Sequence, residues 1–354
     1  MKKLVALVLA GATMLMTGCG STQTAETDAY KGQTLKFYNW GEYVGENVVA
    51  DFEKQYGCKV ISEYFDSNEM MYTKLQAGDA YDIIVPSDYM IERMKREDML
   101  QPLDKDKIPN LSKLTDKMSC DFDPDHEYSV PYFWGNVGLV YNKTKVSKDE
   151  IEAKGWDILQ DTKYKDSIYV YDSERDAFMV AFKALGYSMN TDKEEEITAA
   201  SQWLKTVNDT MGPVYVTDEV IDSMSNGAKD IAVVYSGDAA YILDQNEDMA
   251  YCQPEQGTNV WTDAMVIPKN AENPELANVF INFILEDKES LDNSQTVGYA
   301  SSNQNVLDEL SEGDYAENEA YLPRSGYDKD EYFHDNETLR AKLSELWIKI
   351  KAGN

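Results

Sequence analysis

The first part of the chain alternates between strand-like and helix-like patterns of apolar residues. Strands are expected at residues 35–40, 59–65 and 82–87. Between them, apolar residues recur at helical spacing over residues 46–56, and Gly57 is placed to end that helix. A second helix follows, which Ser67 caps and Gly78 ends. This order of strands and helices is typical of a doubly wound α/β unit.

The same order starts again in the second half of the chain. Strands are expected at residues 167–171, 231–235 and 264–268. Helices are expected at residues 176–185, from Ser236 onward, and from Pro274 onward. No linker rich in Pro, Gly or Ser separates the two units. We therefore expect two α/β domains that are joined by paired strands able to act as a hinge.

The N-terminus has the pattern of an export signal. Two lysines precede an apolar run over residues 4–16, which is too short for an ordinary transmembrane helix. Small residues then precede Cys19, as in the lipobox of bacterial lipoproteins. We expect residues 1–18 to be a lipoprotein signal peptide, Cys19 to carry the lipid, and residues 19–33 to form a flexible tether. The alternative is an ordinary secretion signal with an incidental cysteine.

Length and charge narrow the class of protein. The 354 residues suit two domains, and an apolar content of 43% is enough for packed cores. The chain carries 33 Lys+Arg against 64 Asp+Glu, a formal charge of −31. This excess argues against binding nucleic acid or an anionic membrane surface, because both require clustered cations. A cationic ligand would be favoured, although most of the acids are expected only to keep an exported protein in solution.

Motifs for catalysis or metal binding are missing from the sequence. It contains no GxSxG, GxGxxG, GxxxxGK[ST] or HExxH. His126 and His334 are expected in solvated loops. Cys58, Cys120 and Cys252 form no CxxC or Cys/His cluster, and at most one disulfide is possible among them. We therefore expect no enzymatic activity, no cofactor and no obligatory metal.

Aromatic residues stand beside carboxylates at the ends of several expected strands. Ligands bind at the carboxyl ends of strands in open α/β sheets, so these positions would face a cleft. An aromatic face can cover methylene groups or a cation, and a carboxylate neutralises an ammonium group. By themselves the residues predict an extracellular binding protein for a cationic ligand. Three such pairs are Trp40 with Glu42, Tyr235 with Asp238, and Trp261 with Asp263.

Eight segments carry a resemblance to a known family. In chain order they are YNWGEY (38–43), YFDSNE (64–69), YDIIVPSDY (81–89), VPYFWG (130–135), LGYS (185–188), PEQG (254–257), WTDAMVIP (261–268) and VGY (297–299). With them, the chain resembles the spermidine/putrescine-binding proteins of bacterial ABC importers. The resemblance implies a type II periplasmic-binding-protein fold, with two doubly wound α/β lobes, a ligand cleft and a hinge. The lobes would be residues 34–138 plus 263–307, and residues 139–262 plus 308–354.

The resemblance also implies which residues bind the ligand. The family's aromatic walls match Trp40, Tyr43, Tyr89, Trp261 and Tyr299. Its amine-binding carboxylates match Glu42 and Asp263, and a polar contact matches Ser87. Milder matches are Tyr235, where a known spermidine binder has Trp, and Thr217, where it has Ser. Ser173 and Asp176 stand where the spermidine-type pattern has Asp and Glu. The carboxylate missing at Ser173 leaves open whether spermidine or putrescine is preferred.

The implied function is an exported solute-binding lipoprotein that captures a polyamine by cleft closure and delivers it to an ABC permease and its ATPase. It would be a monomer, lipid-anchored at the outer face of the cell membrane or periplasmic. One alternative keeps the fold but binds another cationic or amino-acid-like solute. A second is an exported hydrolase that uses a carboxylate pair such as Glu42 and Asp263. A third is a binder of a metal such as iron, held by tyrosines.

Overall fold

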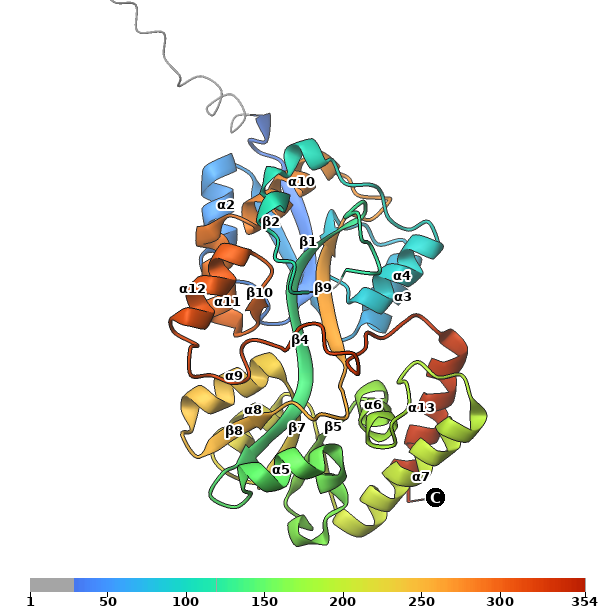
Figure 1. The fold of residues 1–354 in the computed structure, drawn as a ribbon. Helices are drawn as coiled ribbons and strands as arrows, with labels where there is room; N and C mark the ends of the chain where they lie inside the picture. The colour runs from blue at the N-terminus through green and yellow to red at the C-terminus, as the bar shows by residue number, and fades with distance from the viewer. Residues whose placement is uncertain (1–28, 119, 354) are drawn as a thin grey trace, which may run out of the picture.

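One path of hydrogen-bonded strands runs through both halves of the molecule. The computed structural model describes residues 29–118 and 120–353. The strands are β1 (Thr34–Trp40), β2 (Lys59–Phe65), β3 (Ile83–Ile84), β4 (Ser129–Asn142), β5 (Ile168–Tyr171), β6 (Val214–Val216), β7 (Ile231–Tyr235), β8 (Met249–Cys252), β9 (Val260–Val266) and β10 (Ala300–Ser301). Their order is β2-β1-β3-β9-β4-β7-β5-β6, and β8 and β10 also pair with β4. Figure 1 shows β1, β2 and β9 in the upper lobe and β5, β7 and β8 in the lower lobe.

Helices cover the sheet in both lobes (Figure 1). They are α2 (Val48–Tyr56), α3 (Asn68–Gln76), α4 (Asp88–Arg96), α5 (Lys148–Lys154), α6 (Glu174–Ala184), α7 (Glu194–Met211), α8 (Glu219–Ser225), α9 (Ser236–Gln245), α10 (Pro274–Ile284), α11 (Asp287–Val297), α12 (Gln304–Glu312) and α13 (Glu337–Lys351). The structure confirms the expected end of α2 at Gly57 and the expected start of α3 at Ser67. Gly57 ends α2 with a φ of 64°, a left-handed conformation that suits glycine. Ser67 caps α3 by accepting a hydrogen bond from the backbone N–H of Met70.

The long strand β4 belongs to both lobes. Its first part pairs with β9 in the upper lobe, and its last part pairs with β7 and β8 in the lower lobe. The strand was not identified from the sequence, because all but the last of its 14 residues are buried and no polar alternation marks it. β9 begins at Val260, four residues before the strand expected there, so Trp261 and Asp263 lie within it. These two paired strands form the expected connection between the lobes.

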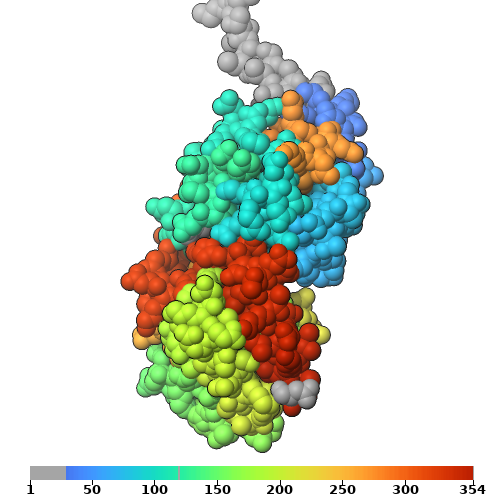
Figure 2. Space-filling model, turned by 90° about the vertical axis from the view of Figure 1, so that its right-hand side faces the viewer, coloured from blue at the N-terminus to red at the C-terminus, as the bar shows by residue number. Residues whose placement is uncertain are grey.

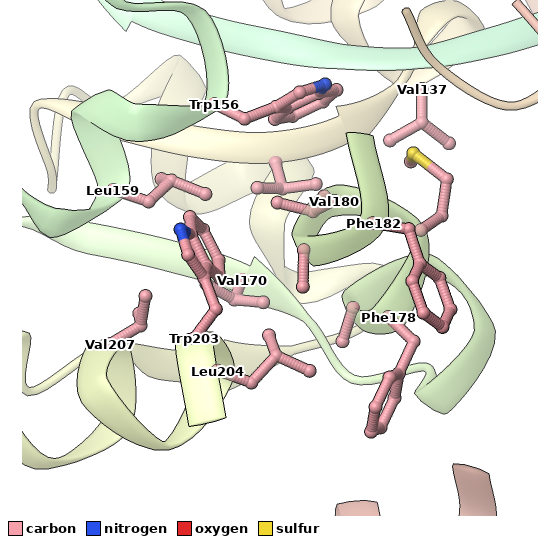
Figure 3. Packing of buried hydrophobic residues seen from close by; sticks show 14 of the residues in the cluster. Val137, Trp156, Leu159, Val170, Phe178, Val180, Phe182, Trp203, Leu204 and Val207 are labelled. Carbon is pink, nitrogen blue, oxygen red and sulfur yellow. The ribbon is translucent and has the colours of Figure 1, made fainter. Parts of the chain in front are cut away.

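Each lobe has a hydrophobic core of its own, and a further cluster of buried residues runs across the boundary between them. In the lower lobe, Phe178 and Phe182 of α6 pack among side chains that include Trp156 and Trp203 (Figure 3). Trp156 is fully buried, and its Nε1 donates to the backbone oxygen of Gly257 at 2.8 Å. This packing holds α6 in place, and α6 carries Asp176 in its first turn.

The C-terminal part of the chain crosses the boundary between the lobes. It leaves α12 beside the upper lobe and reaches α13, which packs on α6 and α7 in the lower lobe. Figure 2 shows this red segment lying across the junction on one face. Lys183 of α6 holds it by an ion pair of 2.8 Å with Glu331. The crossing segment therefore contacts both lobes.

The expected signal peptide and lipidation site, residues 1–18 and Cys19, lie outside the described residues. Of the expected tether, residues 29–33 are described. Within them the ring of Tyr30 contacts that of Tyr56 at 6.1 Å, and Gly32 donates to the backbone oxygen of Gly57. Residues 29–33 of the expected tether thus contact the C-terminal end of α2. In residues 29–118 and 120–353, no helix has the length and apolar character that a membrane span requires.

Candidate ligand-binding site between the lobes

Four aromatic side chains form a row at the boundary between the lobes. The ring centroids of Tyr235 and Trp261 are 6.2 Å apart, and Trp261 and Tyr299 follow at 5.0 Å. Tyr299 in turn lies 5.9 Å from Tyr43. All three contacts are edge-to-face, the geometry that aromatic quadrupoles favour. Tyr43 comes from the loop after β1 and Tyr235 from the end of β7. Trp261 lies in β9, and Tyr299 lies in the turn before β10.

A buried carboxyl group lies at the upper-lobe end of this row. The hydroxyl of Tyr43 donates to Oδ2 of Asp263 at 2.9 Å, and Asp263 is 7% exposed. Burial raises the pKa of Asp263 to about 6, while hydrogen bonds from Ser87 and Tyr43 oppose the rise. The group is therefore a carboxylate at neutral pH, it forms no ion pair with any residue that the structure describes, and a cation there would be stabilised.

A second buried carboxyl group lies at the lower-lobe end. The hydroxyl of Tyr235 donates to Oδ2 of Asp176 at 2.7 Å. Asp176 is 4% exposed, and burial raises its pKa. Its other oxygen, Oδ1, accepts no hydrogen bond from any residue that the structure describes. The two ends of the row thus share one arrangement, a tyrosine hydroxyl bonded to a buried aspartate.

A third carboxyl group, Asp238, lies beside the row in the first turn of α9. The Tyr299 hydroxyl donates to its Oδ1 at 3.4 Å, and burial raises the pKa of Asp238 to about 7. The position of Asp238 just after an aromatic strand end predicted that it would face a cleft, but Asp238 is not among the ligand residues that the family resemblance implies. Only the folded turn brings it to Tyr299.

Two glycines let the rings lie directly on the backbone. A Cβ atom on Gly135 of β4 would come within 2.5 Å of the Trp261 ring, and one on Gly237 would come within 2.5 Å of the Tyr299 ring. Such contacts are too short for any real side chain. Glycine at these positions therefore fixes where the two rings lie.

Several residues expected in the site lie elsewhere or have local partners. Glu42 is exposed at a positive φ of 50°. Thr217 is also exposed, and both its N–H and its hydroxyl bond Oε2 of Glu219 at 2.9 Å. Ser173 caps α6, because its hydroxyl accepts from the N–H of Asp176 at 3.4 Å. Of these three, only Ser173 lies next to a residue at the end of the row, through its hydrogen bond with Asp176.

Trp40 and Tyr89 line the upper lobe near the row. The Trp40 ring lies 4.5 Å from that of Phe65, and its Nε1 donates to the backbone oxygen of Val85 at 2.9 Å. The hydroxyl of Tyr89 accepts from Asn68, whose side-chain nitrogen also donates to Ser87 at 3.0 Å. Asn68 thus ties Tyr89 to the polar contact beside Asp263.

Ion pairs join the lobes on this side of the molecule. The guanidinium carbon of Arg175, on α6, lies 3.5 Å from the ring centroid of Tyr89, on α4. Arg175 also pairs with Glu69 of α3 at 3.0 Å, and Arg340 of α13 approaches the same carboxylate at 3.6 Å. The lobes are therefore closed against each other here.

A second cross-lobe contact lies beside these pairs. Nδ1 of His334, which is exposed as expected, lies 2.9 Å from Oε1 of Glu92 on α4. The N–H of Asp335 donates to the other oxygen of Glu92 at 3.0 Å. Together these contacts attach the crossing segment to the upper lobe.

Neither a disulfide nor a cluster of metal-ligating side chains is found among the described residues. Cys58, Cys120 and Cys252 are free thiols, so no disulfide forms among them in this structure. Across the described ranges 29–118 and 120–353, no group of three His, Cys, Asp or Glu side chains is arranged to hold a metal ion.

Two α/β lobes that present aromatic and carboxyl groups to a shared boundary define a two-lobed ligand-binding protein. The chain belongs to the family of bacterial extracellular solute-binding proteins, whose model matches residues 47–323. It is 33% identical over 350 residues to the spermidine/putrescine-binding periplasmic protein of Salmonella typhimurium, covering 98% of each chain. It is 29% identical over 372 residues to the putrescine-binding periplasmic protein SpuD of Pseudomonas aeruginosa, covering 99% of this chain and 98% of the relative.

Solved structures agree with this assignment. The spermidine/putrescine ABC transporter substrate-binding protein PotD of Streptococcus pneumoniae matches with a TM-score of 0.79 and 36% identity, covering 91% of this chain and 99% of that one. The TpPotD lipoprotein of Treponema pallidum matches with a TM-score of 0.76 and 27% identity, covering 90% and 100%. The expected two-lobed periplasmic-binding-protein fold is confirmed.

Proposed function

We propose that this protein captures a polyamine, spermidine or putrescine or both, between its lobes and delivers it to an ABC permease and its ATPase. The observation that carries the proposal is the row of rings from Tyr235 to Tyr43, which ends at a buried aspartate in each lobe. Each ammonium group would pair with a carboxylate, and the rings would cover the methylene groups. Closure of the lobes excludes water and strengthens these pairs.

The charge around the boundary supports a cationic ligand. A cavity of about 340 Å³ opens where the crossing segment meets α4, and its lining includes Asp88, Glu92, Asp121, Asp330 and Glu331, of which Asp330 and Glu331 are paired with Arg324 and Lys183. Acids gathered at a cleft raise the local concentration of cations and repel anions. The names of the relatives from Salmonella typhimurium and Pseudomonas aeruginosa, which include spermidine and putrescine, point to the same ligand class.

We assign the ligand contacts to the residues gathered at the row. They are Tyr43, Ser87, Asp176, Tyr235, Asp238, Trp261, Asp263 and Tyr299, with Trp40 and Tyr89 behind them. Glu42, Ser173 and Thr217, which the family pattern also implied, are left out because each is exposed or has a local partner. The proposed role is binding without catalysis.

The cellular setting is part of the proposal. Export would remove residues 1–18 and leave a lipid on Cys19 at the outer face of the cell membrane. The resemblance to a lipoprotein of Treponema pallidum supports this anchoring. The protein would act as a monomer, with residues 34–138 plus 263–307 in one lobe and residues 139–262 plus 308–354 in the other.

Thermal unfolding of the protein from residue 29 onward tests the ligand class. A ligand that binds only the folded state raises the unfolding midpoint by mass action. Millimolar putrescine or spermidine should raise it, whereas arginine and maltose should leave it unchanged. A shift with arginine alone would indicate an amino-acid-like solute instead. No shift with either polyamine would refute the proposed ligand.

A further inference from the structure

A buried asparagine shares the lower-lobe end of the site with Asp176. Asn259 is 3% exposed, and its Oδ1 accepts no hydrogen bond from any described residue. Its side chain lies close enough to Asp176 to help lower the pKa of that carboxyl group against the effect of burial. The two side chains therefore lie next to each other, and each has one buried oxygen atom that accepts no hydrogen bond from a described residue. Leaving such acceptors unsatisfied is costly, so a donor bound there would be stabilised.

The register of β9 directs Asn259 toward the ligand. Asn259 directly precedes the strand and continues it, because it forms a parallel bridge with Glu331. Side chains two residues apart on a strand point to the same face. Asn259, Trp261 and Asp263 therefore form a line along one face of β9. Trp261 and Asp263 are contacts of the proposed site, and Asn259 is the third member of the line.

The length of this line suits a diamine. Asp263 is four positions after Asn259, which corresponds to about 13 Å between their Cα atoms along a strand. An extended four-carbon diamine measures about 6 Å between its nitrogens, and a charge-assisted hydrogen bond of about 3 Å at each end brings the total to about 12 Å. Trp261 lies midway, where its ring can cover the methylene groups.

We propose that Asn259 and Asp176 together bind one ammonium group of a diamine whose other ammonium group lies at Asp263. A primary ammonium carries three N–H donors, and the two free oxygens accept two of them. The amide oxygen of Asn259 thus supplies an acceptor at the end of the site where Ser173 brings no carboxylate. This inference rests on the proposed function, and it adds a specificity residue that the family pattern does not include.

Calorimetric titration with putrescine and spermidine tests the inference on three variants. Asn259→Leu removes the amide at similar size, and we expect putrescine affinity to fall by about 10- to 100-fold, as for loss of a hydrogen bond to a charged group. Asn259→Asp keeps an oxygen at the same place but adds a carboxyl group beside Asp176; because the bound ammonium offsets the repulsion between the two carboxyl groups, affinity should stay within about threefold. Asn278→Leu is the matched control, because Asn278 is buried in the upper lobe, where it bonds the N–H of Asp104 and the backbone oxygen of Pro274. It should lower the unfolding temperature and leave the affinity unchanged.

The outcomes separate the inference from the proposed function. If the unaltered protein binds putrescine and Asn259→Leu binds it equally well, the Asn259 subsite is wrong and the polyamine site stands. If Asn259→Asp loses as much affinity as Asn259→Leu, the amide has only a structural role, which also overturns the inference. Tighter binding of spermidine than of putrescine by the unaltered protein would contradict the two-ended diamine geometry. No binding of either amine by the unaltered protein would refute both.

Discussion

The hydroxyl of Tyr43 lies 2.9 Å from Oδ2 of Asp263, although 220 positions separate the two residues in the chain. The contact joins the loop after β1 to the strand β9, and it holds the carboxyl group at the end of the aromatic row. Because the tyrosine is neutral, it orients the aspartate without cancelling its charge. The negative charge stays available for a cationic ligand.

Replacing Asp263 with Asn should remove the charge and keep the shape. The ammonium group would then be buried without a counter-charge, and we expect a loss of about 2–5 kcal/mol of binding free energy. Calorimetric titration with putrescine measures it. Tyr43→Phe, which removes only the hydroxyl, should cost less. A loss of less than about threefold for Asp263→Asn would mean that this carboxylate does not meet the ligand.

Raised aspartate pKa values predict an unusual pH dependence of stability. Burial raises the pKa of Asp263 to about 6 and that of Asp238 to about 7, above the value of about 4 in an unfolded chain. The folded protein therefore binds more protons than the unfolded chain between about pH 4 and pH 7, so stability falls as the pH rises through this window. Carboxyl groups with a lowered pKa, such as Glu150 at about 2, titrate below it, whereas His126, whose pKa burial lowers from its ordinary value of 6.5, partly opposes the effect within it.

Unfolding midpoints measured from pH 5 to pH 7.5 without ligand should accordingly decrease. The decrease should be smaller in Asp263→Asn, which has lost one of the groups. Putrescine affinity should change in the opposite direction and increase with pH, since the ligand requires carboxylates. Midpoints that rise steadily over this range would show that these carboxyl groups are not protonated in the free protein.

Trp261→Leu should weaken binding more than it weakens the fold. The ring lies half-buried against Gly135 and contacts Tyr235 and Tyr299, so leucine keeps apolar bulk there but offers no aromatic face. We expect a loss of about 1–2 kcal/mol in polyamine binding. Trp203→Leu is a useful comparison, because Trp203 lies in the lower-lobe core and its loss should reduce only stability. Unchanged affinity in Trp261→Leu would make this ring part of the core alone.

Arg175→Met should reduce affinity for every ligand by the same factor. Arg175 contacts Tyr89 and Glu69 across the lobe boundary, so it stabilises the closed arrangement. A cation–π contact and a partly exposed ion pair together predict about a two- to thirtyfold loss for putrescine and spermidine alike. Lys205→Met is the matched control, because Lys205 pairs with Asp209 within α7 alone. A selective loss for one amine would instead place Arg175 in contact with the ligand.

The sequence by itself determined the local elements. Gly57 and Ser67 act within one turn of their own helices, through a left-handed φ and a side-chain cap, so their effect can be read without knowledge of the fold. The aromatic and acidic residues at the strand ends were also visible, because strand ends gather at one edge of an α/β sheet. Family resemblance then implied the two-lobed fold and a set of candidate ligand residues.

Only the tertiary structure decided which of these residues meet. Asp263 and Asp176 each receive a tyrosine from a distant segment, and those contacts depend on how the chain packs and the lobes close. Packing likewise buried Asn259 beside Asp176, whereas Glu42 faces solvent. Local sequence signals extend over one helical turn or a few strand residues, while the geometry of this site is set by contacts between residues up to 220 positions apart.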